Sequence, residues 1–104
     1  ADLGTNKNNL RFNLMKEENE EYLLAANNND MVEVADALGD MLYILCGTII
    51  EHGMQHKIDE VFSEIQNSNM SKLGDNGNPI YREDGKVLKG PNYFKPDIKG
   101  ILDI

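Results

Sequence analysis

The sequence predicts an all-α protein, in which an antiparallel helical bundle core is followed by a C-terminal β-hairpin and an extended tail. Apolar residues recur at helical spacing in three segments that precede residue 72. All three prolines and five of the nine glycines lie after that residue, where they favour turns over helices. The acidic residues are concentrated in the helical part, since residues 1–71 carry thirteen acids against four bases.

The first two helices are predicted from their ends. The first covers about residues 10–26, and a side-chain oxygen of Asn8 or Asn9 is expected to accept from its free N–H groups. Asp30 is expected to cap the second helix, which covers about residues 31–52. Gly53 is expected to end that helix in the left-handed conformation.

The third helix is predicted over about residues 57–71, with an apolar stripe of Ile58, Phe62 and Ile65. Residues 78–88 then have the pattern of a short β-hairpin, in which the pair Asp84-Gly85 supplies the positive φ angles of the turn. The dipeptides Gly90-Pro91 and Lys95-Pro96 predict extended coil. We therefore expect a single domain, with a helical core over residues 1–73 and a hairpin and tail over residues 74–104.

Length and charge limit the classes of function. A chain of 104 residues makes one small domain, and its formal charge of −8 argues against binding a nucleic acid polymer, whose phosphates require Lys and Arg. The single cysteine, Cys46, excludes an internal disulfide and a cysteine-based zinc site. No run of 18 apolar residues and no signal peptide is present, which predicts a cytoplasmic protein with no membrane partner.

Carboxylates fall on helix faces that otherwise predict a core. On the first helix Glu17 and Glu21 lie within the apolar stripe and Glu18 lies at its edge. On the second helix, residues 41–50 are apolar or small on every side, which is typical of a helix buried all round. Three acids nevertheless share one face of that helix: Glu33, Asp36 and Asp40.

Two carboxylate stripes directed at one interior require neutralisation, and a bound divalent cation supplies it. Ligands that are all oxygen favour Mg²⁺, or Mn²⁺, over zinc. The stripe of the third helix continues through Asn69 to Lys72, which brings an amide and a cation toward the same interior. A lysine beside such a cluster is what a phosphate-bearing ligand requires.

At these residues the sequence resembles the MazG-like all-α nucleoside triphosphate pyrophosphohydrolases, above all their short bacterial and phage branch. The matching motifs are Lys-Glu-Glu-x-x-Glu at 16–21, Asp-Ala-Leu-Gly-Asp-Met-Leu-Tyr at 36–43, Asn-Met-Ser-Lys at 69–72 and the tail from Pro79 to Tyr93. One departure concerns the second helix, where many members carry Glu-x-x-Asp and this chain has Ala37 at the Glu position. Either Asp36 substitutes as the partner of Asp40, which we favour, or Glu33 and Asp36 form the motif one turn earlier.

The resemblance implies Mg²⁺-dependent hydrolysis of a (deoxy)nucleoside triphosphate between its α- and β-phosphates. The metal ligands it implies are Glu18, Glu21, Asp36 and Asp40, with Glu33 as an additional candidate. Glu17 is the expected catalytic residue, which orients or deprotonates the attacking water. The expected substrate-binding residues are Asn69, Lys72, Tyr43 and Tyr93.

Two alternatives remain open at this point. One is a phosphoribosyl-ATP pyrophosphohydrolase, which shares the helical core, and the other is a non-catalytic helical module that uses its acids for metal-dependent assembly. The apolar second helix predicts that Ile44 and Ile50 pack against another copy of the chain, giving a homodimer or a homotetramer. The expected location is the cytoplasm, which is that of the host if the protein is phage-encoded.

Overall fold

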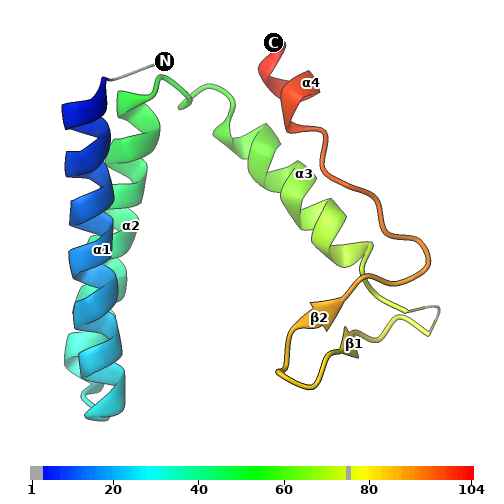
Figure 1. The fold of residues 1–104 in the computed structure, drawn as a ribbon, viewed down its shortest axis with the longest axis horizontal. Helices are drawn as coiled ribbons and strands as arrows, with labels where there is room; N and C mark the ends of the chain where they lie inside the picture. The colour runs from blue at the N-terminus through cyan, green and yellow to red at the C-terminus, as the bar shows by residue number, and fades with distance from the viewer. Residues whose placement is uncertain (1–3, 75) are drawn as a thin grey trace. The chain divides into compact units, whose positions relative to one another are not determined.

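The computed structural model describes residues 4–74 and 76–104, and the chain folds into two compact units. The helical-pair unit comprises Ala1–Gln55 and the hairpin unit comprises His56–Ile104. Helices dominate and a single two-stranded sheet lies near the C-terminus, which confirms the predicted all-α class with a C-terminal hairpin (Figure 1). No helix in the described ranges is both long enough and apolar enough to span a membrane. The predicted boundary at residue 73 within one domain stays a prediction.

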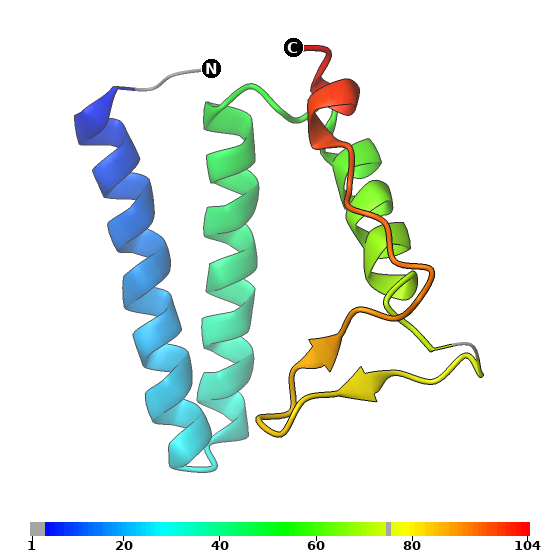
Figure 2. The same ribbon diagram turned by 45° about the vertical axis from the view of Figure 1, so that its right-hand side comes forward.

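The helical-pair unit consists of α1 (Thr5–Asn27) and α2 (Met31–Glu51), which lie antiparallel and side by side (Figures 1 and 2). Its fully buried residues are small: Ala25 on α1 and Ala37 on α2. Since neither side chain extends beyond Cβ, the two helix backbones can approach closely at that level. The carboxylates described below lie within about two helical turns of these alanines.

The helix ends follow the predicted caps in part. Asp30 caps α2 as predicted, since its Oδ1 accepts from the Glu33 N–H at 3.2 Å, and Gly53 has the expected positive φ of 72°. The prediction that Asn8 or Asn9 caps the first helix is wrong. That helix begins at Thr5 after Gly4, whose φ is 82°, and no side chain caps it. A glycine can leave the helical conformation by itself, so the chain needs no capping side chain there.

The expectation that α2 is buried all round is not met within one chain. Leu42 is 61% exposed, Tyr43 81% and Ile50 60%, whereas Ile44 is half-buried. The residues of α2 that pack on α1 follow helical spacing, as predicted, and the remaining apolar side chains face outward. Two helices alone do not provide the surface that a helix apolar on every side requires.

The hairpin unit contains α3 (Ile58–Met70), β1 (Ile80–Tyr81), β2 (Val87–Leu88) and α4 (Ile98–Leu102). The strands pair antiparallel, with Ile80 opposite Leu88 and Tyr81 opposite Val87. The short helix α4 lies in a segment that was expected to be extended coil. The missed signal is Asp97, which follows Pro96 and caps α4 by accepting from the Gly100 N–H at 3.0 Å.

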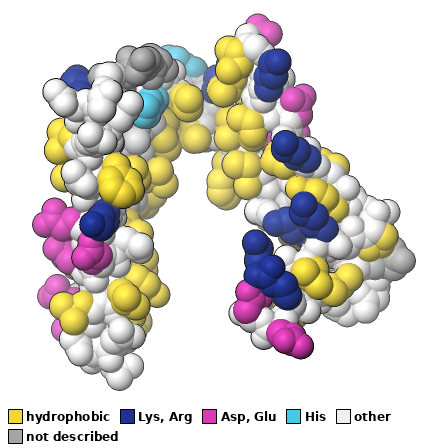
Figure 3. Space-filling view, in the orientation of Figure 1, with side chains coloured by type: hydrophobic (Ala, Val, Ile, Leu, Met, Phe, Trp, Pro, Cys, Tyr) yellow, Lys and Arg dark blue, Asp and Glu magenta, His cyan; other side chains and the backbone are white. Residues whose placement is uncertain are grey.

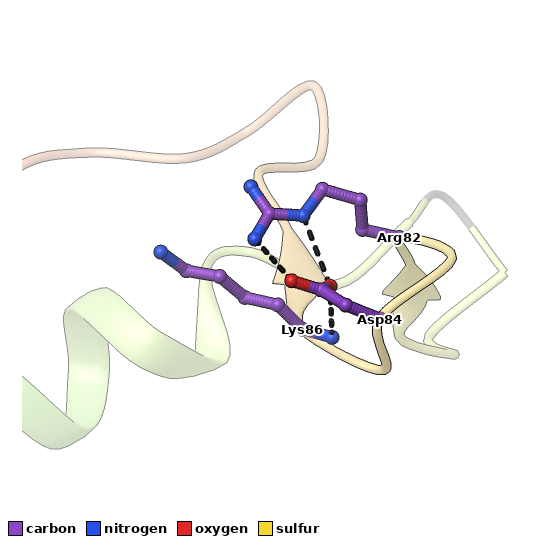
Figure 4. A network of polar contacts seen from close by, with 3 residues as sticks. All are labelled: Arg82, Asp84 and Lys86. Atoms are coloured by element: carbon purple, nitrogen blue, oxygen red, sulfur yellow. Dashed lines mark hydrogen bonds and ion pairs between the residues drawn. The ribbon is translucent and has the colours of Figure 1, made fainter.

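The hairpin turn differs from its prediction in one residue. Gly85 has a positive φ of 87°, whereas Asp84 does not have a positive φ. Asp84 instead fixes the turn with its side chain, because Oδ1 accepts from the Lys86 N–H at 3.1 Å and from Arg82 Nε at 3.0 Å (Figure 4). The Arg82 hydrogen bonds lower the pKa of Asp84 and raise the pKa of Arg82.

Candidate active site

Three carboxylates, those of Glu17, Glu21 and Asp40, lie near the side chain of Glu18, and we call the four acids together the acid cluster. Glu18 is half-buried, and its Oε2 atom is buried and accepts no hydrogen bond from the described residues. Burial raises the pKa of Glu18, and the charge and side-chain contact of Glu21 raise it further. The charges of Asp40 and Glu17 act in the same direction. The cluster therefore joins three acids of α1 to one acid of α2.

The orientation of the α1 acids differs from the prediction by one position. Glu17 and Glu21 were expected within the core-facing stripe, yet both are exposed, and Glu18 faces α2 instead. The buried alanine pair sets this rotation, because Ala25 lies two helical turns after Glu18 on the same face. The structure thus brings Glu17, Glu18, Glu21 and Asp40 near one another, but the half-buried acid of α1 is Glu18 and not Glu17 or Glu21.

A pocket of about 190 Å³ lies at the end of the helical pair nearest the α1–α2 connection. Glu21, Glu33 and Asp36 all line it, beside the buried Ala37. Glu21 belongs to the acid cluster and also lines the pocket. The cluster and the pocket together therefore include every residue that was predicted to bind metal. The two alternatives for the second helix, Asp36 with Asp40 or Glu33 with Asp36, both remain compatible with this arrangement.

The donor set fits a hard cation in its chemistry, since every candidate ligand is a carboxylate oxygen and one of them is buried without a partner. In the parts of the chain that the structure describes, however, no three Asp, Glu, His or Cys side chains converge closely enough to hold a metal ion as they stand. Like charges explain the spacing, because unscreened carboxylates repel one another when no cation lies between them. Figure 3 shows Asp and Glu side chains gathered partway along the helical pair.

Tyr43 lies on α2 and lines a different groove, of about 530 Å³, together with Arg11 and Ile50. Arg11 crosses from α1 to α2, where Nε donates to Thr48 Oγ1 and Nη2 donates to the Ile44 carbonyl, both at 3.0 Å. Arg11 was not among the residues predicted to have a role. The available signal was its position seven residues before Glu18, which places both side chains on one face of α1.

The hairpin unit holds the other predicted substrate-binding residues at the C-terminal end of α3. Asn69 is exposed, and its carbonyl accepts from the half-buried Lys72 at 3.1 Å. Tyr93 is half-buried on the tail, and its N–H donates to the Gly90 carbonyl at 3.3 Å. The α3 stripe differs from its prediction, since Phe62 is exposed and Ser68 is buried. The face of α3 that packs against the tail therefore lies about one residue further round the helix than the predicted apolar stripe.

The structure is therefore that of an all-α protein with a carboxylate-lined pair of antiparallel helices and a C-terminal hairpin. The chain belongs to the phosphoribosyl-ATP pyrophosphohydrolase (PRA-PH) family, whose sequence profile matches residues 2–69. This family membership confirms the resemblance to the MazG-like all-α pyrophosphohydrolases. The profile covers both helices of the acid cluster, together with α3 through Asn69.

A solved structure supports the same assignment. The crystal structure of a "putative NTP pyrophosphohydrolase" from Exiguobacterium sp. 255-15 is 36% identical over 72% of this chain, with a TM-score of 0.59. The match covers 43% of that protein, so the present chain spans less than half the length of this relative. No curated protein is significantly similar to the chain.

Proposed function

We propose that the chain is a Mg²⁺-dependent nucleotide pyrophosphohydrolase. It cleaves a (deoxy)nucleoside triphosphate between the α- and β-phosphates and releases the monophosphate and pyrophosphate. The observation that carries this proposal is the acid cluster, with its buried and unpartnered Glu18 oxygen, in a chain of this family. A cation is the partner that this oxygen lacks.

The acids divide into ligands and a base. Glu18, Glu21, Asp36 and Asp40 hold Mg²⁺, with Glu33 as a further ligand; Mn²⁺ can replace Mg²⁺. When bound, the metal neutralises charge on the phosphate oxygens and makes coordinated water more acidic. Glu17 is exposed and adjacent to the proposed ligand Glu18 in the sequence, but it is not itself a ligand. It can therefore accept the proton of the attacking water while every ligand stays on the metal.

The residues proposed to bind the nucleotide have basic or uncharged side chains. Lys72 pairs with a phosphate, and Asn69 hydrogen-bonds phosphate, sugar or base. The rings of Tyr93 and Tyr43 offer stacking surfaces for the base, and Tyr43 is exposed enough to be reached. These assignments are supported by the residue chemistry and by the grouping of Asn69, Lys72 and Tyr93 at one end of α3.

Pyrophosphate release from a panel of ribo- and deoxyribonucleoside triphosphates, measured with Mg²⁺ and with EDTA, tests the proposal. We expect at least one nucleotide to yield equal amounts of monophosphate and pyrophosphate with Mg²⁺ and none with EDTA. Glu21→Gln is expected to abolish release, because Glu21 borders both the acid cluster and the pocket. The control is Glu20→Gln, since Glu20 is exposed and pairs with Lys16 at 3.9 Å. A metal-independent reaction, or an active Glu21→Gln variant, would contradict the assignment.

Phosphoribosyl-ATP is the second candidate substrate, and the description of the matching family favours it. The bond cleaved and the metal chemistry are the same, so only the nucleotide specificity differs. The profile ends at residue 69, and the hairpin and tail lie beyond it. Including phosphoribosyl-ATP in the panel separates the two candidates, and a chain that cleaves neither is a non-catalytic assembly module.

We also propose that the active form is a homodimer or a homotetramer. The exposed apolar side chains of α2, which include Leu42, Leu45 and Ile50, support this, because water-exposed apolar area of this extent is unusual on a monomer. Light scattering at micromolar concentration should report at least a dimer. A monomer that retains full activity would show that this face needs no second copy.

A further inference from the structure

The tail is fastened to α3 by hydrogen bonds that involve its backbone. The buried Ser68 donates from Oγ to the Phe94 carbonyl at 2.8 Å, and the Phe94 N–H donates to Ser71 Oγ at 3.1 Å. One turn or more toward the start of α3, Glu64 Oε2 accepts from the Asp97 N–H at 2.9 Å. Because these bonds satisfy both backbone groups of Phe94, they fix the register of the tail along the helix.

A glycine allows the tail to cross the end of α3. A Cβ placed at Gly90 would lie 2.3 Å from the Leu73 carbonyl oxygen and 2.6 Å from the Lys72 carbonyl oxygen. Both distances are far below van der Waals contact, and both atoms belong to the backbone, so no side-chain movement relieves the clash. The tail therefore passes directly over the residue that was predicted to bind phosphate.

This crossing brings a second lysine to the same end of α3. Lys89 directly precedes Gly90, and its Nζ lies 4.9 Å from the centroid of the Tyr93 ring. A cation at this distance from an aromatic face is attracted to it, which restricts the lysine to a small region. Figure 3 shows further Lys and Arg side chains on the face of the hairpin unit that is in view.

A single lysine is poorly suited to bind a polyphosphate at this place. The carbonyl end of a helix carries a partial negative charge of about half an elementary unit, which opposes an anion beside Lys72. The tail crosses the carbonyls of Lys72 and Leu73, just past the end of α3, and so brings the backbone of Lys89 next to that of Lys72. We propose that Lys89 is a second phosphate-binding residue, which Ser68, Ser71 and Gly90 position beside Lys72 to bind the oligophosphate of the substrate.

The ligand class is a linear oligophosphate, because two lysines whose backbones lie next to each other can together match several adjacent anionic groups. This inference deepens the proposed function and rests on it. Ser68, Ser71 and Gly90 are positioning residues in this account, because they act on the ligand through Lys89 and Tyr93. Lys89 itself contacts the ligand.

The test is titration calorimetry of the full chain with inorganic tripolyphosphate in EDTA, together with steady-state kinetics on the best nucleotide. We expect Lys89→Gln to weaken tripolyphosphate binding at least fivefold and to raise KM by a similar factor, while kcat stays within twofold. The matched control is Lys95→Gln, which removes the same charge from an exposed lysine further along the tail and should change neither quantity by more than twofold. If the two variants behave alike, Lys89 is not a phosphate-binding residue and the proposal fails.

The positioning role has its own test. Ser71→Ala removes the acceptor of the Phe94 N–H and should reproduce the loss of tripolyphosphate affinity, whereas Ser71→Thr keeps the hydroxyl and should restore it. Ser63→Ala, an exposed serine of the same helix, is the control. Equal binding by Ser71→Ala and the unmodified protein would overturn the positioning role.

The two proposals can fail separately. If tripolyphosphate binding depends on Lys89 but no nucleotide yields pyrophosphate, the proposed function is wrong and the phosphate-binding edge stands. If pyrophosphate is released and Lys89→Gln changes neither KM nor the tripolyphosphate affinity, the edge is wrong and the proposed function stands.

Discussion

The two units of the chain differ in charge and in how their residues are held. Residues 1–55 carry ten acids and three bases, whereas residues 56–104 carry eight acids and seven bases. The helical pair is joined at small buried alanines and leaves a carboxylate oxygen without a partner. The hairpin unit is held by hydrogen bonds between side chains and backbone: Ser68 Oγ donates to a carbonyl, whereas Ser71 Oγ and Asp97 Oδ1 accept from N–H groups. The residues predicted to bind metal all lie in the helical-pair unit, whereas Lys72, which was predicted to bind phosphate, lies in the hairpin unit.

The largest expected effect separates these two roles by kinetics. Asp40→Asn should lower kcat by about 10²–10³-fold, because it removes a proposed ligand of the Mg²⁺ that would neutralise charge in the transition state. Lys72→Gln should instead raise KM about tenfold with a smaller change in kcat, since a phosphate contact acts in the ground state as well. Steady-state rates of pyrophosphate release measure both. If the two substitutions change the same parameter, the division between the units does not hold.

The next effect decides which acids of α2 act as ligands. Asp36→Asn should reduce activity by at least tenfold more than Glu33→Gln if Asp36 and Asp40 form the ligand pair. Both residues line the same pocket, so the two variants are matched in environment. The opposite ranking, measured at saturating Mg²⁺, would place the pair one turn earlier, at Glu33 and Asp36.

Substitutions at two glycines of α2 test how much the contact of Arg11 with α2 contributes to the free energy of unfolding. Gly39→Ala adds a methyl group into open space and should stabilise the protein by about 0.5–1 kcal/mol through helix propensity. Gly47→Ala gains the same propensity, but its Cβ would lie 2.8 Å from Arg11 Nη2 and would displace the hydrogen bonds of that side chain. Chemical denaturation should place Gly47→Ala about 1–2 kcal/mol below Gly39→Ala. Equal free energies of unfolding would show that Arg11 contributes little.

A smaller effect, of opposite sign, is expected at the centre of the acid cluster. Glu18→Gln removes a buried charge that its neighbours repel, so the melting temperature in EDTA should rise by a few degrees. Glu20→Gln is the exposed control and should not raise it. Adding Mg²⁺ should stabilise the unmodified protein more than Glu18→Gln. A lower melting temperature for Glu18→Gln in EDTA would refute the repulsion.

The smallest effect concerns the hairpin turn. The Arg82 hydrogen bonds hold the pKa of Asp84 below its ordinary value of 3.8, so the ionised form is favoured in the folded state. A lowered pKa contributes stability that is present above the unfolded pKa and is lost as pH falls through the folded pKa. An NMR titration of the Lys86 amide should therefore show a midpoint below 3.8. A midpoint at or above that value would mean that the Arg82 contact does not persist in solution.

The sequence predicted the elements better than their faces. Helical spacing located α1, α2 and α3 to within a few residues, because periodicity depends only on neighbours along the chain. It did not predict that Glu18 is half-buried while Glu17 and Glu21 are exposed, or that Ser68 is buried in place of Phe62. Which face turns inward depends on the partner element, and the partners here are small residues and a tail that carry no strong hydrophobic signal.

The candidate site was predictable as a set of residues and not as an arrangement. The acids of α1 and α2 were found because charges on core-directed positions require an explanation. Arg11 and Lys89 were missed, since an arginine or lysine near an apolar run usually lies in solvent with its stem on the surface. The contact of Arg11 is with Thr48, 37 residues away, and the proposed role of Lys89 depends on Gly90 lying over the Lys72 carbonyl, which no local pattern connects to them.

The fastening of the tail to α3 also has an evolutionary consequence. The hydrogen bonds that hold the tail on α3 lie between Glu64 and Asp97. Lys89, Gly90 and Phe94 fall outside residues 2–69, the part of the chain that the family profile matches. If the tail binds the nucleotide as proposed, this segment can diverge between relatives while the carboxylates of α1 and α2 keep the same role. A chimera that exchanges residues 64–97 with those of a relative would then change the nucleotide preference and leave the metal dependence unchanged.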